Sequence, residues 1–549
     1  MYPFMGQFKC YKILTVGLVF LVWIIYLQMF WPDSITYRPP GPRPVSKFAS
    51  SFMEPSFLLD SLPQVLSNLT SLLYWPPTPG DGAKLLASTS PQTSTYHLKG
   101  PTQASYTLGG YLEAVLVARD HWGRPKTHGG DLFRAQLLGL ELKAGVPGDI
   151  QDLENGTYHL SFPLLWAGRA QVQVRLVHSS EAVGVLRRIW REKRATVDFR
   201  GYFRGIQGRE ETVICNIDPQ STGAKRSTCQ YKDAVSGELW FCAQPPTLPC
   251  DSLVGHSSGS YLKVTTRHDE DLLAWNVTDK LLSQGISPIL VRPAAPINTS
   301  LALSPRPPCR PGLLAPKPSG FYHQNVWHSL ACSSRSFPTT DSILGCLAGR
   351  IVHMMGDSTL RQWWEYLRDT VPSLKPVNLH VTYQVGPLMA VDTTRGIVLH
   401  WRAHSWPLRS LRTPVASLHS VVRELAGLAG GPHTVVVLGL GAHFTTFPPS
   451  IFVRRLAGIR AAVTALLARE PSTLCGHQIG QHWLQIRVWQ RLVHPPGEPA
   501  PSSCLFWSPC GLCGRLGNDL QPGPAGQHSP GKLIVRNEVD LLLSFICPT

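Results

Sequence analysis

The chain has 549 residues, enough for two or more domains with full hydrophobic cores. Its 43% hydrophobic and 16% charged residues are typical of globular protein and exclude a chain that is disordered throughout. Lys and Arg total 51 and Asp and Glu total 35, which gives a net charge of +16 that is spread along the chain without a basic block. We therefore expect a solvated basic surface suited to acidic glycans or membrane headgroups, and no nucleic-acid partner.

The N-terminus predicts entry into the secretory pathway. Residues 13–31 form an apolar run long enough to span a membrane as a helix, and Lys9 and Lys12 precede it. We therefore expect a short cytoplasmic tail at 1–12, a signal-anchor at 13–31 and a type II membrane protein whose remainder faces the lumen. A cleaved signal peptide is the alternative, although bulky residues stand where a cleavage site needs small ones.

Residues 32–102 are rich in Pro, Ser and Thr, which is typical of a stalk that holds a domain away from the membrane. Four Asn-X-Ser/Thr sequons in the part assigned to the lumen are candidate glycosylation sites. They are Asn68, Asn155, Asn276 and Asn298.

From residue 103 to 287 the pattern changes to short apolar runs separated by Gly, Pro, Asp and Asn turns. This pattern predicts an antiparallel β-sandwich of the immunoglobulin type, with Tyr158 either facing inward after an edge turn or serving only as a core residue. Residues 179–191 have helical spacing and predict a short surface helix.

Four cysteines within 36 residues accompany this region, namely Cys215, Cys229, Cys242 and Cys250. In an oxidising compartment they predict two disulfides of unspecified connectivity. A zinc site is the alternative, but the spacings lack a paired Cys-X-X-Cys.

Residues 288–318 are rich in proline and predict an interdomain linker, which leaves 319–549 as a second domain. Strand-like and helix-like segments alternate through this domain, and residues 435–441 are almost continuously apolar. The alternation predicts an α/β fold with a parallel sheet covered by helices.

The segment IVHMMGDSTLR at 351–361 predicts a strand, a turn at Gly356 and a helix that begins after Asp357. This order presents Ser358 as a nucleophile in several hydrolase folds, but it also occurs at ordinary strand-to-helix junctions. His443 follows the apolar run at 435–441, so we expect it at the same sheet edge as Ser358. We expect Trp363 and Trp364, on the predicted helix after Ser358, to pack in the core rather than to form a flat aromatic surface that binds sugars.

Several motifs together resemble the neurexophilin and PC-esterase domain (NXPE) family. They are CNIDPQSTGAKRSTCQYKDAVSGELWFCAQPPTLPC, SGFYHQNVWHSLAC, GDSTLRQWWEYL, GAHFTTFP, IFVRRLAGIRAA and VRNEVDLLLSFICP. The resemblance implies a neurexophilin-like N-terminal domain and a C-terminal PC-esterase domain similar to SGNH hydrolases. Such domains occur in glycan O-acetyltransferases and acylesterases, which use a GDS serine and a C-terminal Asp-X-X-His pair.

Carried over to this chain, the resemblance makes Ser358 the nucleophile and places Gly356 and Asp357 in the site around it. Arg361 matches the arginine of GDSxxR and is either structural or anion-binding. His443 matches a histidine of the family, with a role that stays open between lining the pocket and assisting the chemistry.

The chain departs from the family pattern near its C-terminus, where no Asp-X-X-His can be found. Asp519 and His528 are nine residues apart, so we carry them only as a candidate orienting carboxylate and base, with Asp540 as the alternative orienting group. The surrounding segment 475–530 lacks periodicity, and the sequence leaves open a divergent loop, an alternative exon or an erroneous gene model. Its Cys510-X-X-Cys513 pair predicts a bridge or free thiols more than a metal site.

Two functions therefore remain open. One is acyl transfer to, or hydrolysis from, a glycan hydroxyl through Ser358, with a glycan substrate, an acyl donor and no cofactor or metal. The other is a non-catalytic glycoprotein whose neurexophilin-like domain binds a cell-surface partner. Both place the chain in the secretory pathway, either on the ER/Golgi membrane facing the lumen or as a secreted protein.

Overall fold

The structure is a computed structural model of the chain. It describes residues 75–76, 84–192, 195–223, 227–293, 306–313, 316–479, 504–507 and 531–548. Within these ranges no helix combines the length and the apolar character that a membrane span requires. The expected signal-anchor at 13–31 lies outside the described residues, as does most of the expected stalk.

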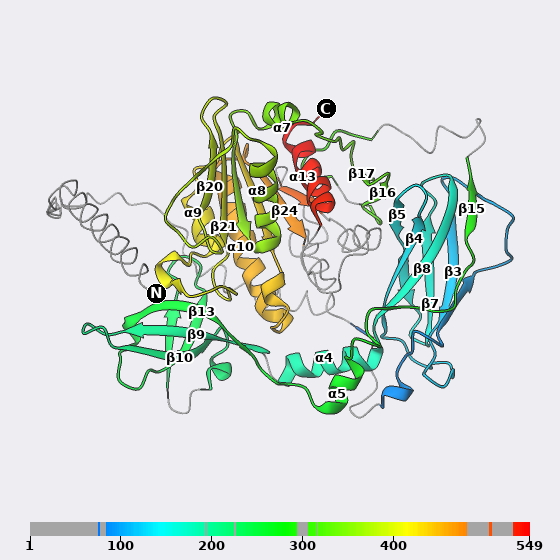
Figure 1. Cartoon of the computed structure of the whole chain (residues 1–549), viewed down its shortest axis with the longest axis horizontal. Coiled ribbons are helices and arrows are strands. Elements are labelled where there is room, and N and C mark those ends of the chain that lie inside the picture. The colour runs from blue at the N-terminus through cyan, green and yellow to red at the C-terminus, as the bar shows by residue number, and fades with distance from the viewer. Residues whose placement is uncertain are drawn as a thin grey trace, which may run out of the picture. The chain divides into compact units, whose positions relative to one another are not determined.

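Two mainly antiparallel sheets take most of their strands from residues 95–178, and the second also takes strands from residues 280–329 (Figure 1). The first has the order β1 (Thr95–Leu98), β3 (Tyr111–Val117), β7 (Thr157–Pro163) and β6 (Asp149–Asp152). The second has the order β17 (Val326–Ser329), β16 (Gly320–His323), β5 (Ala144–Pro147), β4 (Leu132–Gly139), β8 (Gly168–His178), β15 (Ile289–Arg292) and β2 (Tyr106–Thr107). The two-residue strand β14 (Lys280–Leu281) also pairs with β8.

The two sheets share one hydrophobic core. Buried residues alternate with exposed or partly exposed ones along β3 and β8, which is the period expected of strands with one face turned inward. Leu116 of β3 and Val172 of β8 belong to the same cluster of buried side chains. Tyr158 is buried among them and its hydroxyl donates to Asp131 Oδ2 at 2.8 Å, so this tyrosine faces inward.

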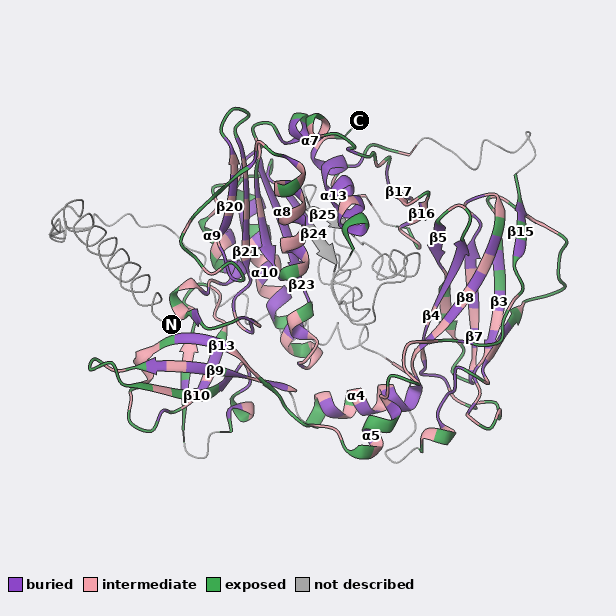
Figure 2. Ribbon diagram, viewed as in Figure 1, coloured by how far each residue is buried: buried purple, intermediate pink, exposed green. Residues whose placement is uncertain are grey.

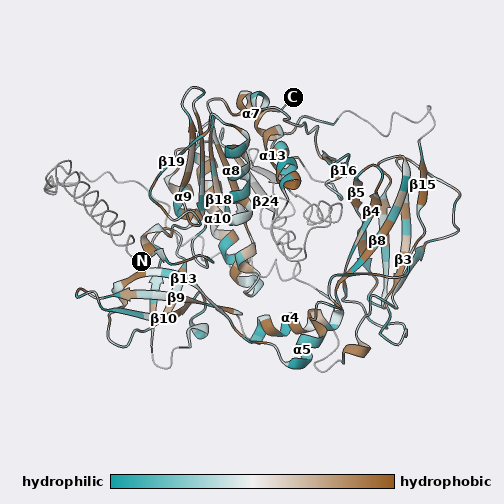
Figure 3. Cartoon of the chain, viewed as in Figure 1, coloured by the Kyte–Doolittle hydropathy of each residue, from teal (hydrophilic) through white to brown (hydrophobic). Residues whose placement is uncertain are grey.

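Helix α4 (Ser180–Glu192) follows the second sheet, in agreement with the helical spacing at 179–191. Apolar and polar residues lie on different faces of this helix (Figure 3). Its buried Val185 and Ile189 pack against Leu272 of α5 (Arg267–Leu272). Arg188 of α4 also forms a 2.6 Å ion pair with Asp269 of α5.

The cysteine-rich segment and the residues around it form five strands of a six-stranded sheet. Its order is β11 (Thr228–Lys232), β12 (Leu239–Ala243), β10 (Glu210–Asn216), β9 (Val197–Arg204), β13 (Leu253–Tyr261) and β22 (Thr413–Pro414). The predicted pair of disulfides is confirmed, and the connectivity is Cys215–Cys242 and Cys229–Cys250. Gly201 is required beneath them, because a Cβ there would lie 2.4 Å from the Cys215 sulfur.

This sheet has a separate core and reaches into the C-terminal half of the chain. Phe199 and Trp240 pack beside the two bridges together with Phe447, which lies more than 200 residues later. The edge strand β22 also comes from the C-terminal half and pairs His256 with Thr413. The region expected as one domain at 103–287 therefore contains two β units with different cores.

The C-terminal half contains a seven-stranded sheet. Its order is β19 (Lys375–Val377), β20 (Leu388–Asp392), β21 (Ile397–Ala403), β18 (Ile351–Gly356), β23 (Thr434–Leu440), β24 (Leu474–Ile479) and β25 (Cys504–Trp507). The five strands from β21 to β25 in this order pair in parallel, and β19 and β20 add an antiparallel edge. Parallel strands need crossover connections, and those that join β18, β21, β23 and β24 in chain order contain helices.

Helices cover both faces of the parallel sheet. On one face α7 (Thr340–Leu347), α8 (Ser358–Thr370) and α13 (Lys532–Ile546) share a core with β18 and β21. On the other face α9 (Val421–Gly427) and α10 (Pro449–Arg469) share a core with β23. All seven residues of β23 are buried, as expected for a central strand covered on both faces (Figure 2). Trp363 and Trp364 are also buried in α8, so they are core residues.

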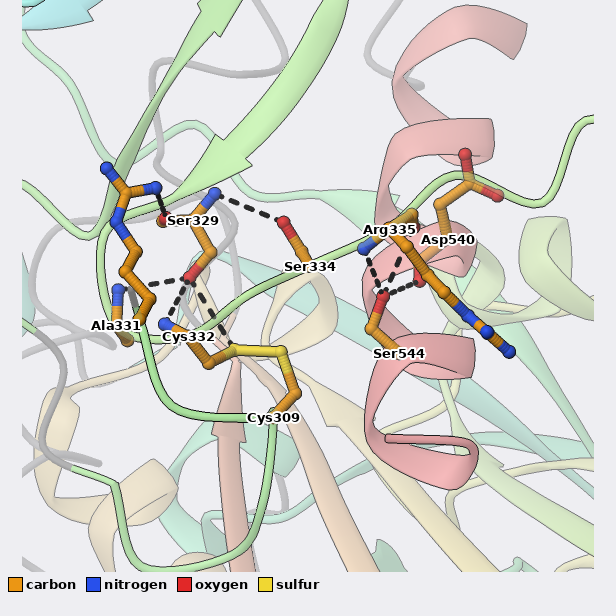
Figure 4. The surroundings of a disulfide bond; sticks show 9 residues. Cys309, Ser329, Ala331, Cys332, Ser334, Arg335, Asp540 and Ser544 are labelled. Atoms are coloured by element: carbon orange, nitrogen blue, oxygen red, sulfur yellow. Dashed lines mark hydrogen bonds between the residues drawn. A yellow bond between two sulfur atoms is a disulfide. The ribbon is translucent and has the colours of Figure 1, made fainter. Parts of the chain in front are cut away.

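Helix α13 is tied to the domain by disulfide and hydrogen bonds. The bridge Cys346–Cys547 joins the residue after α13 to α7, across a sequence separation of 201. Closing the long loop between Cys346 and Cys547 restricts the unfolded chain, which favours the folded state. A further bridge joins Cys309 to Cys332, and in the same region the hydroxyl of Ser544 in α13 accepts from the Arg335 N–H at 3.0 Å (Figure 4).

The structure confirms a multidomain chain with mixed α and β structure. It also places regular strands in two segments that the sequence suggested were irregular. Strand β1 lies in the expected stalk at 32–102, and β15 lies in the expected linker at 288–318. Both segments supply backbone pairing to larger sheets, which composition alone does not reveal.

Glu538 of α13 is a carboxyl group buried in the core. It is almost fully buried and accepts a 2.7 Å hydrogen bond from Trp363 Nε1. Burial raises its pKa to about 7, despite the opposing effect of the Trp363 hydrogen bond. The folded state therefore disfavours the charged form, so the group contributes most to stability below its unfolded pKa of 4.5 and loses that contribution as pH rises through 7.

We predict that Glu538→Gln stabilises the protein in a pH-dependent way. The amide oxygen retains the Trp363 hydrogen bond without a buried charge, so the gain in unfolding free energy should approach about 3 kcal/mol near pH 8 and vanish near pH 4. Thermal unfolding at both pH values measures it. The exposed control Glu470→Gln should change the unfolding free energy by less than about 0.5 kcal/mol. A gain for Glu538→Gln that is equal at both pH values would contradict the assignment.

Candidate catalytic site at the strand ends

Three neighbouring parallel strands end at one edge of the C-terminal sheet. Gly356 at the end of β18 lies opposite Ala403 of β21 and opposite Gly439 of β23. The residues that follow these three strands include Ser358, His404 and His443. Because the carboxyl ends of parallel strands share an edge, the topology brings these side chains to one region, as we expected for Ser358 and His443.

Gly356 permits the close approach of β18 and β23. A Cβ at this position would lie 1.8 Å from the carbonyl oxygen of Gly439. The next peptide continues the contact, because the Asp357 N–H donates to the same carbonyl at 2.9 Å. Only glycine therefore fits between the end of β18 and the neighbouring strand.

Asp357 connects the start of α8 to the loop after β23. It is the N-cap of α8, and its Oδ1 accepts from the Thr359 N–H at 3.0 Å and from the Thr359 hydroxyl at 2.6 Å. Its Oδ2 accepts from the Ala442 N–H at 3.1 Å, one residue before His443. This buried carboxylate therefore holds the corner that carries Ser358 against the loop that carries His443.

Ser358 is the first residue of α8, and its side chain is exposed. Its Oγ makes no hydrogen bond to a histidine within the described ranges. The first N–H groups of a helix lack intrahelical acceptors, which makes the start of α8 suitable for stabilising negative charge. The corner thus presents a hydroxyl to solvent beside a favourable anion environment.

His443 and His404 form a hydrogen-bonded pair at this edge. His443 lies in the short 3-10 helix η6 (Ala442–Phe444), and His404 directly follows β21. His443 Nδ1 and His404 Nε2 are 2.9 Å apart, and His404 Nδ1 lies 2.7 Å from the Ser405 carbonyl oxygen. His404 is fully buried, whereas His443 is partly exposed.

The surroundings keep both imidazoles neutral at neutral pH. Burial lowers the pKa of His443, and the nearby Arg409 adds to this effect, while the Asp357 carboxylate opposes it. Burial also lowers the pKa of His404 well below its ordinary value, with smaller contributions from His443 and Arg455. A neutral imidazole retains one basic nitrogen, which is the form that accepts a proton.

Sequence reasoning identified His443 but missed His404. The signal was present, because His404 follows a predicted strand just as His443 does. What the sequence did not give was the order of the strands, which makes β21 and β23 the two neighbours of β18.

Arg361 lies one turn along α8 from Ser358 and has partners within the protein. Its Nε forms a 3.1 Å ion pair with Glu365, and its guanidinium lies over the rings of Tyr383 and Trp401 at 5.4 and 5.5 Å. The side chain is 20% exposed. The sequence left open a structural or an anion-binding role for Arg361, and these contacts favour the structural one.

The loop after β21 is held by the cysteine-rich sheet. His256 Nε2 lies 2.8 Å from the Leu408 carbonyl, and Trp240 stacks on Trp406 with ring centroids 5.1 Å apart. Arg455 of α10 forms a 2.7 Å ion pair with Glu238, which lies in the turn before β12. The cysteine-rich sheet therefore fixes the segment that begins with His404.

The sequence also predicted a candidate base and a candidate orienting carboxylate in the C-terminal segment. Asp519 and His528 lie outside the described residues, so their roles stay predictions. Asp540 lies in α13, where its Oδ1 accepts from the Phe337 N–H at 3.2 Å and its Oδ2 lies 3.8 Å from Arg536 Nε. Both carboxylate oxygens of Asp540 therefore already have partners, the Phe337 N–H and the Arg536 side chain.

Two of the four candidate glycosylation sites lie among the described residues. Asn155 and Asn276 are exposed, which glycosylation requires, while Asn68 and Asn298 lie outside the described residues. Within the described ranges, no group of three or more His, Cys, Asp or Glu side chains could hold a metal ion.

We predict that Gly356→Ala strongly destabilises the C-terminal domain. The added methyl group would overlap the Gly439 carbonyl, so β18 and β23 must separate, at a cost of about 3 kcal/mol or more. Gly345→Ala in α7 is the matched control, because its Cβ meets nothing within 4 Å and should stabilise the helix by up to about 1 kcal/mol. Thermal unfolding measures both variants. Equal melting temperatures for the two would refute the close approach.

Comparison with known families covers both halves of the chain. A family model described as neurexophilin matches residues 104–273, a range that contains all four cysteines of the six-stranded sheet. A second model, described as NXPE family member 4-like, C-terminal domain, matches residues 327–479, which contain Ser358, His404 and His443. The two matches occur in the order that the resemblance implied. The chain therefore belongs to the NXPE family.

Proposed function

We propose that this protein is a glycoprotein of the secretory pathway whose C-terminal domain transfers or hydrolyses an acyl group, such as acetyl, on a glycan hydroxyl. Ser358 is the nucleophile in this proposal. The observation that carries it is the position of an exposed serine at a strand-to-helix corner, beside the strand ends that carry two neutral histidines. The parallel sheet with helices on both faces supports an SGNH-like PC-esterase fold, and the two N-terminal sheets with one core support a neurexophilin-like sandwich.

The proposed chemistry proceeds in two steps. Ser358 Oγ attacks the acyl carbonyl and gives its proton to a histidine, and the bond between the acyl carbon and the donor oxygen breaks as the donor leaves with that proton. A glycan hydroxyl, or water, then attacks the acyl-serine and gives its proton to the histidine. The bond between the acyl carbon and Ser358 Oγ breaks, Oγ takes that proton, and the acylated glycan, or the free acid, leaves. The N–H groups at the start of α8, other than that of Thr359, which donates to Asp357, are the candidates for binding the oxyanion in both steps.

A non-catalytic binding glycoprotein is the second candidate. It is favoured by one feature of the described site, since His443 has an imidazole behind it where serine hydrolases place a carboxylate. In that case the neurexophilin-like domain would recognise a cell-surface protein, and the C-terminal domain would serve as a scaffold.

The location of the protein rests on its disulfides and its family. Four bridges among the described residues require an oxidising compartment, which fits the secretory pathway or secretion. Within that setting we propose that residues 13–31 act as a type II signal-anchor, with a cleaved signal peptide as the alternative.

We predict that a fluorophosphonate probe labels the intact protein at Ser358. The reagent reacts only with an activated serine, so Ser358→Ala should lose all labelling. Ser260→Ala removes an exposed serine from β13 and should label like the native protein. In-gel fluorescence of purified, folded protein is the measurement. An absence of labelling in folded native protein would reject the enzyme and support the binding glycoprotein.

A further inference from the structure

We propose that His404 is a positioning residue that makes His443 the general base for Ser358. His404 would do so by fixing the tautomer of His443, a task that a carboxylate performs in other serine hydrolases. This inference rests on the proposed acyl chemistry at Ser358. It supplies a base from the described part of the chain, because no Asp-X-X-His pair that could supply one is found in the sequence.

The hydrogen-bond partner of His404 Nδ1 determines which nitrogen of this ring carries the hydrogen. Its Nδ1 lies 2.7 Å from the Ser405 carbonyl oxygen, and a carbonyl oxygen only accepts hydrogen bonds. Nδ1 of His404 must therefore carry a hydrogen. The pKa of this fully buried imidazole is well below its ordinary value, so the ring carries a single hydrogen at neutral pH. Its Nε2 is consequently an acceptor.

The hydrogen bond between the two rings then fixes the tautomer of His443. His443 Nδ1 lies 2.9 Å from His404 Nε2, so Nδ1 of His443 must be the donor. The neutral His443 ring then has its lone pair on Nε2. That nitrogen is the one that general-base catalysis needs, because it accepts a proton without a change of tautomer.

Charged groups on several elements act on the positive charge that appears when His443 accepts a proton. Asp357, at the β18–α8 corner, raises the pKa of His443 and so favours the imidazolium. Arg409, on the loop after β21, acts in the opposite direction. On the α10 side, Arg455 lies near His404 and forms an ion pair with Glu238 of the cysteine-rich sheet. The hydrogen bond to His404 remains in place throughout, since Nδ1 keeps its hydrogen.

A neutral imidazole is a weaker partner for an imidazolium than a carboxylate is. Hydrogen bonds to an ionised group are roughly twice as strong as neutral ones. We therefore expect a base that works at lower pH than an ordinary histidine and stabilises the transition state less than a carboxylate-backed histidine does.

The test is the rate of fluorophosphonate labelling of the intact chain between about pH 5 and about pH 9. In the native protein the rate should rise with pH to a plateau, with a midpoint below 6.5. His404→Leu removes the acceptor, so the rate at neutral pH should fall by about 10- to 100-fold and the midpoint should move to lower pH. His404→Gln keeps an acceptor for His443 Nδ1 and should recover most of the rate.

His400→Leu is the matched control, because His400 is a half-buried histidine of β21, the strand that His404 follows, and it should label at the native rate. Should the leucine variant at 404 fail to fold, His404→Asn replaces it, since the shorter amide does not reach His443, and the same loss is expected. Folding is checked by circular dichroism.

The possible outcomes separate the inference from the proposed function. Labelling that depends on Ser358 but keeps its rate and midpoint in His404→Leu would overturn the role of His404 alone. Labelling lost in His528→Gln but retained in His443→Gln would overturn it in favour of a base from the C-terminal segment. No labelling of native protein would overturn both the inference and the acyl chemistry.

Discussion

The candidate site depends on one buried carboxylate. Asp357 accepts two hydrogen bonds from Thr359 at the start of α8 and one from the Ala442 N–H in the loop after β23. A buried carboxylate is costly unless such donors satisfy it, and here one donor, the Ala442 N–H, lies 85 residues from Asp357 in sequence. The same group therefore caps the helix, joins two strand ends and supplies the negative charge that acts on His443. The closeness of the strands beneath it requires Gly356.

The second constraint comes from the cysteine-rich sheet. This sheet is cross-linked by two disulfides, and it contacts the loop that begins at His404. Arg455 connects the two parts, since it pairs with Glu238, donates to the Trp406 carbonyl and lies over the ring of Phe444. In this family member the neurexophilin region is thus part of the structure that orders the edge of the C-terminal sheet. A purely independent binding module would have no such contacts.

The sequence predicted the features that depend on local pattern. The apolar run before Gly356 and the capping residue Asp357 predicted the corner at Ser358, and the clustered cysteines predicted two bridges. It did not predict features that depend on distant pairing. The pairing of His256 with Thr413, and the hydrogen bond between His404 and His443, have no local signal because each needs the order of strands in a sheet. The roles of Asp519 and His528 stay predictions, as they lie outside the described residues.

The central claim is that His404 fixes the tautomer of His443, and this can be measured without any assay of activity. Long-range proton–nitrogen NMR spectra of the intact chain with labelled histidine distinguish the two neutral tautomers and the imidazolium, and a His443→Gln variant assigns the signals. At neutral pH the account predicts a neutral His443 with its hydrogen on Nδ1 and an unprotonated Nε2. A hydrogen on Nε2 of the neutral ring, or a doubly protonated ring at that pH, would contradict it.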